Sequence, residues 1–325
     1  MKKFMKTCAI IALVLLVLGA MLTYIGGSFK SVEIVADVVD NVTNGNISLD
    51  LTGLAEWGSN IGESAMEGIE RFEETVNYDI DAATIFNDAF EIVTEDVTKS
   101  FEAVDITSLE VAAGGCAFTI KESVDENFYV ETVGLNKFQS YVEDNTLSVK
   151  GTINEVTGIH NTAGSITLHV PAGFVFEEVA MEIGAGAMDL GTVNASKITL
   201  EAGAGEILAD DIAGEELEVT VGMGECSVDK LQVTKLSGEV GAGNLSFEEV
   251  LAEQIELECA MGNLEMEIVG AKEDFNYNIQ CGMGNVELGN ESYSGLAQDK
   301  KVDNGASKNI ELDCAMGNVE ISFTN

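Results

Sequence analysis

Residues 239–265 read EVGAGNLSFEEVLAEQIELECAMGNLE and contain two copies of one short pattern. Each copy has an apolar residue, a small residue, a variable residue and then a glycine, followed by alternating polar and apolar residues. The same glycine recurs along the second half of the chain, at Gly186, Gly205, Gly224, Gly243, Gly262, Gly284 and Gly317. The first five are spaced by 19 residues, and the last two follow gaps of 22 and 33. A fixed period is typical of one structural unit stacked on itself, so the sequence predicts a solenoid.

Each repeat contains two short segments with the two-residue period of β-strands. In one repeat these are Glu206–Ala209 and Leu217–Val221, and in the second segment the apolar residues alternate with Glu218 and Thr220. Alternation predicts that Leu217 and Val221 face the core while Glu218 faces solvent. A repeat this short has no room for a helix. We therefore predict an all-β fold, a parallel β-helix of coils of about 19 residues with glycine at one corner. Each strand is expected to pair with its copy one coil later in the sequence. The general rule for parallel crossovers favours a right-handed coil.

The net charge of the chain is −40, and it is unevenly distributed. Residues 1–30 hold four lysines and no acidic residue, so the remainder has 12 basic and 56 acidic residues, or −44. An acidic surface repels phosphate backbones. Nucleic acid is therefore excluded as a partner.

The lysines at the N-terminus precede an uncharged apolar run from Cys8 to Ile25. A run of 18 residues crosses most of a hydrocarbon core about 30 Å thick, and the preceding lysines favour an N-inside orientation. We therefore expect residues 1–29 to form a cytoplasmic tip and a retained transmembrane helix, with the bulk of the chain extracytoplasmic in a single-pass membrane protein. A cleaved signal peptide is the alternative. Residues 30–102 would form an acidic juxtamembrane stalk of two amphipathic helices, or of short strands, and residues 103–325 the solenoid.

The segment before the regular repeats carries a resemblance to a known family. Phe118-Thr119-Ile120, Tyr129-Val130-Glu131, residues 144–149 and Val170-Pro171 are followed by the repeated Gly-Ala-Gly unit. This order resembles the DUF4097 family of adhesin-like bacterial β-solenoid proteins over about residues 103–325. The resemblance implies a role at the cell envelope, because some members look like membrane-anchored accessories of Gram-positive envelope-stress signalling. It supplies no catalytic residues.

In a stacked solenoid, equivalent residues of successive repeats form columns. Cys259, Cys281 and Cys314 occupy the position held elsewhere by Ile183, Ala202, Val221 and Val240, so we interpret them as free thiols in the core. Methionines precede several corner glycines, and packing explains them better than binding of a soft metal. Asparagine follows the last four corner glycines and predicts a ladder of side-chain amides.

Two acidic columns are also predicted. Glu182, Glu201, Glu239, Glu258 and Asp313 share one position, and Glu265, Glu287 and Glu320 share another. Ca²⁺ could bridge such carboxylates, but no calcium-binding loop is present, and a solvated face that resists aggregation explains them better. No catalytic motif, metal set or cofactor fingerprint stands out. We therefore expect no enzyme activity, no cofactor and no metal site.

The departures from the 19-residue period indicate where a partner would bind. Three extra residues fall near Gly270 to Phe275, and fourteen fall within Gly289 to Lys308. Insertions in solenoids emerge as loops and are often the binding face. The larger insertion contains the candidate partner-contact residues Tyr293, Lys300, Lys301 and Lys308.

These observations favour a protein that is held in the membrane by its N-terminal helix and acts without catalysis in binding or sensing at the bacterial cell envelope. Its expected partner is an envelope protein or a cell-wall component. A passive structural or adhesive surface protein is the main alternative, and a polysaccharide-active β-helix enzyme is the third.

Overall fold

The computed structural model describes residues 91–92, 95–135, 137–152, 164–294 and 298–324. The predicted anchor at 1–29 and most of the predicted stalk lie outside these residues. Among the residues described, no helix has the length and apolar composition needed to cross a membrane.

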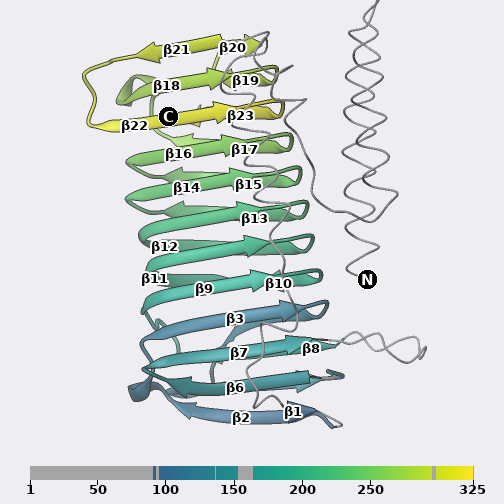
Figure 1. Ribbon diagram of the computed structural model, residues 1–325. Helices are drawn as coiled ribbons and strands as arrows, with labels where there is room; N and C mark the ends of the chain where they lie inside the picture. Colours follow the sequence, from purple (N-terminus) through teal and green to yellow (C-terminus); the bar gives the residue numbers. More distant parts are fainter. Residues whose placement is uncertain (1–90, 93–94, 136, 153–163, 295–297, 325) are drawn as a thin grey trace, which may run out of the picture.

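The described chain is a stack of coils, and each coil has one strand on each of two faces (Figure 1). The A face holds the strands that lead into the glycine corner: β3 (Ser108–Gly114), β7 (Thr146–Thr152), β9 (Phe176–Ile183), β11 (Thr192–Ala202), β14 (Lys235–Val240), β16 (Gln254–Cys259), β18 (Phe275–Cys281) and β22 (Lys308–Cys314). The B face holds the strands that leave it: β4 (Ala117–Glu122), β8 (Ser165–Val170), β10 (Ala187–Asp189), β13 (Glu225–Gln232), β15 (Asn244–Leu251), β17 (Asn263–Val269), β19 (Asn285–Leu288) and β23 (Asn318–Thr324). The long strand β12 (Glu206–Val221) contributes to both faces. The first residues of β11 also reach the B face, because residues 192–194 pair with residues 211–213 of β12.

Neighbouring coils pair in parallel at the predicted offset of 19 residues. Ile198 lies opposite Leu217, Leu217 opposite Leu236, and Leu236 opposite Ile255. The all-β class and the 19-residue coil are thus confirmed.

The core lies between the two faces and is filled by the inward residue of every alternate position. Leu217 and Val221 are fully buried, whereas Glu218 between them is exposed, as the alternation predicts. Burial of one such side chain contributes about 1.5–3 kcal/mol. Because each coil repeats this contribution, the stack is stabilised along its whole length.

The order of coils in space differs from the order in sequence at the C-terminal end. β22 pairs with β16 on one side and with β18 on the other, and β23 lies likewise between β17 and β19. The last coil is therefore inserted between the two coils that precede it (Figure 1, yellow between greens). The expectation that each strand pairs with its copy one coil later in the sequence is wrong here. The long connection between β19 and β22 gives the chain enough length to return by one coil.

The N-terminal end shows the same arrangement. β3 pairs with both β7 and β9, and β4 pairs with both β8 and β10. The first coil in sequence is thus the second coil in space, inside the stack (Figure 1).

Antiparallel strands close both ends of the stack. At the N-terminal end β6 (Lys137–Glu143) pairs with β7 and β5 (Asn127–Val133) with β8. Beyond these lie β1 (Glu91–Ile92) and β2 (Val97–Glu102). At the C-terminal end β20 (Glu291–Ser294) pairs with β19, and β21 (Gln298–Val302) pairs with β18.

The β structure thus begins upstream of the predicted boundary at residue 103. The helical interpretation does not hold for residues 97–102, which form a strand against β5. In this strand the exposure of side chains alternates with a period of two. The apolar residues that predicted a helix are Phe86, Phe90, Val93 and Val97, so this spacing ends where the strand begins.

Candidate functional site

The seven predicted corner glycines form one continuous column. A Cβ added to Gly224 would lie 2.1 Å from the carbonyl oxygen of Gly205, and one added to Gly243 would lie 2.2 Å from that of Gly224. These distances are far below any van der Waals contact, so each corner needs glycine because backbone of the neighbouring coil approaches it. Among the corner glycines that the structure describes, Gly186 alone has a positive φ.

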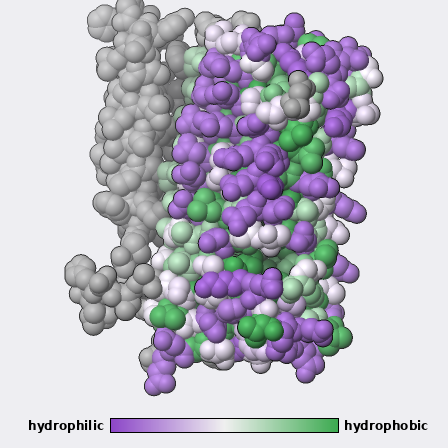
Figure 2. Space-filling view, turned by 180° about the vertical axis from the view of Figure 1, so that it is seen from behind, coloured by the Kyte–Doolittle hydropathy of each residue, from purple (hydrophilic) through white to green (hydrophobic). Residues whose placement is uncertain are grey.

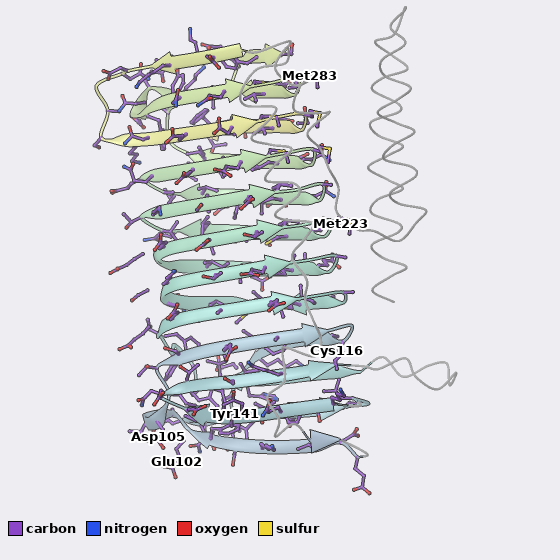
Figure 3. The ribbon with its side chains drawn as sticks, viewed as in Figure 1. Glu102, Asp105, Cys116, Tyr141, Met223 and Met283 are labelled. Carbon is purple, nitrogen blue, oxygen red and sulfur yellow. The ribbon has the colours of Figure 1, made fainter. Side chains whose placement is uncertain are left out.

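One further corner was not predicted from the sequence. Gly114-Gly115-Cys116 lies one coil below the first predicted corner, and a Cβ on Gly186 would meet the carbonyl oxygen of Cys116 at 2.3 Å. The pair Gly114-Gly115 was the available signal. Cys116, Met223 and Met283 lie along this one edge of the stack (Figure 3).

The three predicted core cysteines are neighbours in space. Cys314 lies opposite both Cys259 and Cys281, and all three are buried and free. Sγ of Cys314 donates a hydrogen bond to the carbonyl oxygen of Gly317 at 3.4 Å, and Sγ of Cys259 donates one to that of Gly262 at 3.3 Å. The neighbouring Cys314 thiol lowers the pKa of Cys259 and raises the pKa of Cys281. In the same column Val240 lies opposite Cys259, so the interpretation of an apolar column is confirmed.

The predicted asparagine ladder is present. Asn263 donates a hydrogen bond from Nδ2 to Oδ1 of Asn244 at 3.0 Å, and Asn285 donates in the same way to Asn318 at 3.0 Å.

A second amide ladder, missed from the sequence, lies on the A face. Asn309 donates to Gln254 Oε1 at 2.9 Å, and Asn276 donates to Asn309 Oδ1 at 3.0 Å. Gln254, Asn276 and Asn309 share one repeat position, each eight residues before its corner glycine, so the period of the sequence could have aligned them. The inserted last coil places Asn309 between the other two.

The acidic columns are also observed. Glu201 lies opposite Glu182, and Glu258 lies opposite both Glu239 and Asp313. In the second column Glu320 lies opposite Glu265 and Glu287. Burial, and then the charge of Glu201, raise the pKa of Glu182. In the part of the chain that the structure describes, no group of three or more His, Cys, Asp or Glu residues is arranged to hold a metal ion.

The predicted partner-contact residues belong to the end of the stack. Tyr293 lies on β20, Lys300 and Lys301 lie on β21, and Lys308 opens β22. We call β20 and β21 together the C-terminal cap. The larger insertion is therefore mainly a pair of strands that covers the outer edge of the last coil in space, β18–β19.

The four side chains of this group have different surroundings. Tyr293 is half-buried, packs against the core and donates a hydrogen bond to Glu291. The ammonium group of Lys308 lies 5.3 Å from the centroid of the Phe275 ring. Lys300 and Lys301 are exposed, although Lys300 lies opposite the buried Ile279. An exposed lysine on an edge strand hinders the addition of further strands.

A lysine outside the predicted group fixes the C-terminal cap to the body. Nζ of Lys272 lies 3.0 Å from Oε1 of Glu291 and donates a hydrogen bond to the carbonyl oxygen of Leu288 at 3.3 Å. It also lies 5.4 Å from the centroid of the Tyr277 ring. Lys272 belongs to the three-residue insertion near Gly270. The sequence did not predict a role for this insertion.

The charge of the outer surface changes along the stack. Residues 176–269, the coils between the two ends, contain 21 acidic and three basic residues, or −18. Residues 270–308 contain six acidic and four basic residues, or −2. Figure 2 shows that the side seen from behind is largely hydrophilic, with separate apolar patches. Residues 270–308 are thus much less acidic than the coils between the two ends of the stack.

Three solved structures are similar to the chain: a "putative cell adhesion protein" of Clostridium sporogenes, and a "putative lipid binding protein" and a "putative adhesin" of Parabacteroides distasonis. Their sequence identities are 15%, 14% and 15%, and their TM-scores are 0.31, 0.32 and 0.30. The matches cover 71%, 71% and 70% of this chain and 99%, 98% and 97% of the other chains. No curated protein matches the sequence. The sequence profile of Toastrack DUF4097 matches residues 106–288 and 159–322. The chain therefore belongs to the Toastrack DUF4097 family.

Proposed function

We propose that this protein is a membrane-anchored binding module of the bacterial cell envelope, which contacts an anionic partner through its C-terminal cap. The partner is an envelope protein or a cell-wall polymer that carries carboxylate or phosphate groups. The observation that carries the proposal is the exposure of Lys300 and Lys301 on the C-terminal cap, at the end of a body of opposite charge.

The distribution of charge supports contact through the end of the rod. The central coils carry −18 and repel anionic polymers along both faces. At physiological ionic strength the Debye length is about 8 Å, so charges more than one or two coils away are largely screened at the C-terminal cap. An anionic group can therefore approach Lys300 and Lys301 although the whole chain is acidic.

The rigidity of the site also supports binding. β21 is paired along five residues with β18, and the Lys272–Glu291 ion pair joins the two insertions. A site on paired strands loses less conformational entropy on binding than a loop does.

Binding to purified anionic cell-wall polymers and to envelope protein extracts tests the proposal. We expect the full chain to bind one of them, with an affinity that falls as salt concentration rises, and the double variant Lys300→Glu/Lys301→Glu to lose this binding. The matched control is Lys121→Glu/Lys230→Glu, which makes the same charge change at exposed positions of the body. Equal binding by the cap variant and the wild-type chain would refute the assigned contact.

The location is tested separately. We expect the full chain to sediment with membranes and to be cleaved by protease added to intact cells stripped of their wall. A chain that lacks residues 1–29 should be lost from the membrane fraction, and resistance of the full chain to external protease would contradict the extracytoplasmic placement.

A further inference from the structure

The inserted last coil occupies a slot that is built from the same chain on both sides. We define the slot as the space between β16–β17 and β18–β19, which β22–β23 fills. The coil buries Ile310, Leu312, Val319 and Ile321 in it. Its exposed outer row is fixed by the amide hydrogen bonds of Asn309 to Gln254 and Asn276.

The two walls of the slot match each other as well as they match the coil between them. Both walls carry cysteine before the corner, glycine at the corner and asparagine after it, at residues 259, 262 and 263 and at residues 281, 284 and 285. Each wall also carries a glutamate two residues after that asparagine, at residues 265 and 287. β18–β19 can therefore stack directly on β16–β17 in the same register when β22–β23 is absent. Departure of the last coil thus leaves no unpaired edge inside the stack.

The connection to the last coil contains a short hinge. If β20 stays paired with β19 and β21 with β18, only residues 303–307 connect this fixed part of the chain to β22. Asn276 holds this hinge, because its Oδ1 accepts hydrogen bonds from the backbone N–H groups of Asn304 and Ala306 at 3.0 and 3.2 Å. Gly305 has a φ of 69°, a conformation that favours glycine. Five residues span about 17 Å when extended, which is several times the distance of about 4.8 Å between neighbouring strands.

From this geometry we propose that β22–β23 exchanges between two copies of the chain, so that the last coil of each copy fills the slot of the other. The partner is a second copy because the slot presents, residue for residue, the columns that this chain's own last coil completes. Exchange of an identical element forms the same contacts as the closed monomer, so it requires little free energy beyond that of association. At low concentration the monomer is favoured, because the tethered coil has an effective concentration in the millimolar range.

Cross-linking between two variants, each with one added cysteine on the surface, tests the exchange. A full chain with Gln254→Cys and a full chain with Asn309→Cys are unfolded together in urea, refolded at high protein concentration and treated with a short bifunctional maleimide. Both positions are exposed. Residue 254 on β16 lies opposite residue 309 on β22 only when a last coil fills the slot. We expect a covalent dimer of the two variants at several-fold the level given by Lys197→Cys with Asn309→Cys. Lys197 lies in the same row of the A face, three coils from Gln254.

Two outcomes would overturn the proposal. One is covalent dimer from the Gln254→Cys and Asn309→Cys pair at the level of the Lys197→Cys control. The other comes from deletion of residues 292–305 in both cysteine chains, which restores the 19-residue spacing and removes the reason for insertion. If the deleted chains cross-link as strongly as the complete ones, the dimer does not form through the slot.

Discussion

Gly317 lies directly against Gly262 although 55 residues separate them, whereas Gly284, only 22 residues after Gly262, lies one coil further away. A Cβ on Gly317 would be 2.6 Å from the carbonyl oxygen of Gly262, and a Cβ on Gly284 would be 2.5 Å from that of Gly317. The corner column is therefore continuous in space while it is out of order in sequence. The insertion between Gly284 and Gly317 supplies the length of chain that this order requires.

Substitution of a corner glycine should destabilise the whole stack. In Gly243→Ala the new Cβ would lie 2.2 Å from the backbone oxygen of Gly224, which no rotamer change can relieve. We expect a loss of about 1–3 kcal/mol in the free energy of unfolding, measured by urea denaturation. The control is Met223→Ala at an exposed corner position, with an expected change within about 0.5 kcal/mol. Equal stability of Gly243→Ala and the wild-type chain would contradict the close approach of the coils.

Replacement of a crowded carboxylate should stabilise the protein. The pKa of Glu182 is raised by burial and by Glu201, so the folded state disfavours its charged form. Its contribution is therefore most favourable below the unfolded pKa of about 4.3 and is lost as the pH rises. We expect Glu182→Gln to raise the free energy of unfolding at pH 7 and to have less effect at pH 4. The exposed Glu178→Gln, four residues earlier on the outer side of the same strand, should change little at either pH. A destabilising effect of Glu182→Gln at pH 7 would contradict this sign.

Buried thiols should make the fold sensitive to alkali. Burial raises the pKa of Cys226 to about 12 and that of Cys116 to about 11. An unfolded thiol ionises near pH 8.5, so above that pH the folded state binds more protons than the unfolded state and stability falls. We expect the urea midpoint to decrease between pH 8 and pH 10.5. In Cys226→Ala this decrease should be smaller, although the midpoint at pH 7 is lower. An unchanged pH slope in Cys226→Ala would show that this thiol does not contribute.

The Lys272–Glu291 pair should hold the C-terminal cap. Hydrogen bonds from Tyr293 and Lys272 lower the pKa of Glu291, so its stabilising effect is present above its unfolded pKa and is lost as the pH falls through the folded value. We expect Lys272→Met to accelerate amide hydrogen exchange in β20 at pH 7 and to leave exchange in β13 unchanged. Unchanged exchange in β20 would mean that strand pairing alone fixes the cap.

Deletion of residues 292–305 should convert the inserted stack into a sequential one. After this deletion the corner glycines before and after the junction are separated by 19 residues, and Asn309 aligns with Gln254 of the earlier repeat. We expect a folded chain in which β18 pairs directly with β16. Cysteines placed at Gln254 and Asn276 should then cross-link within one chain, and loss of folding would show that the inserted coil is indispensable.

The sequence predicted the parts of the fold that depend on a strict period. The 19-residue spacing and the alternation within Leu217–Val221 were sufficient for the parallel coils, the buried cysteine column and the first asparagine ladder. These features follow from local pattern, because each coil contacts only its neighbours.

The order of the end coils could not be predicted in the same way. A coil with the residues of 275–288 matches β16–β17 as well as one with the residues of 308–321, so column identity does not distinguish the two arrangements. The difference comes from antiparallel pairing of β20 and β21 with the outer coil, and those strands are short and polar. The role of Lys272 could not be predicted either, because its partner Glu291 lies in the other insertion and the repeat period does not align the two insertions.

The most direct test of the coil order is intramolecular cross-linking in the full chain at low protein concentration. Two double variants are compared, Gln254→Cys/Asn309→Cys and Gln254→Cys/Asn276→Cys, with a short bifunctional maleimide and peptide mapping of the product. The inserted arrangement predicts efficient cross-linking of residue 254 to residue 309 and little cross-linking to residue 276, which lies a full coil further away. Preferential cross-linking of residue 254 to residue 276 would contradict the insertion of the last coil, and with it the slot and its exchange.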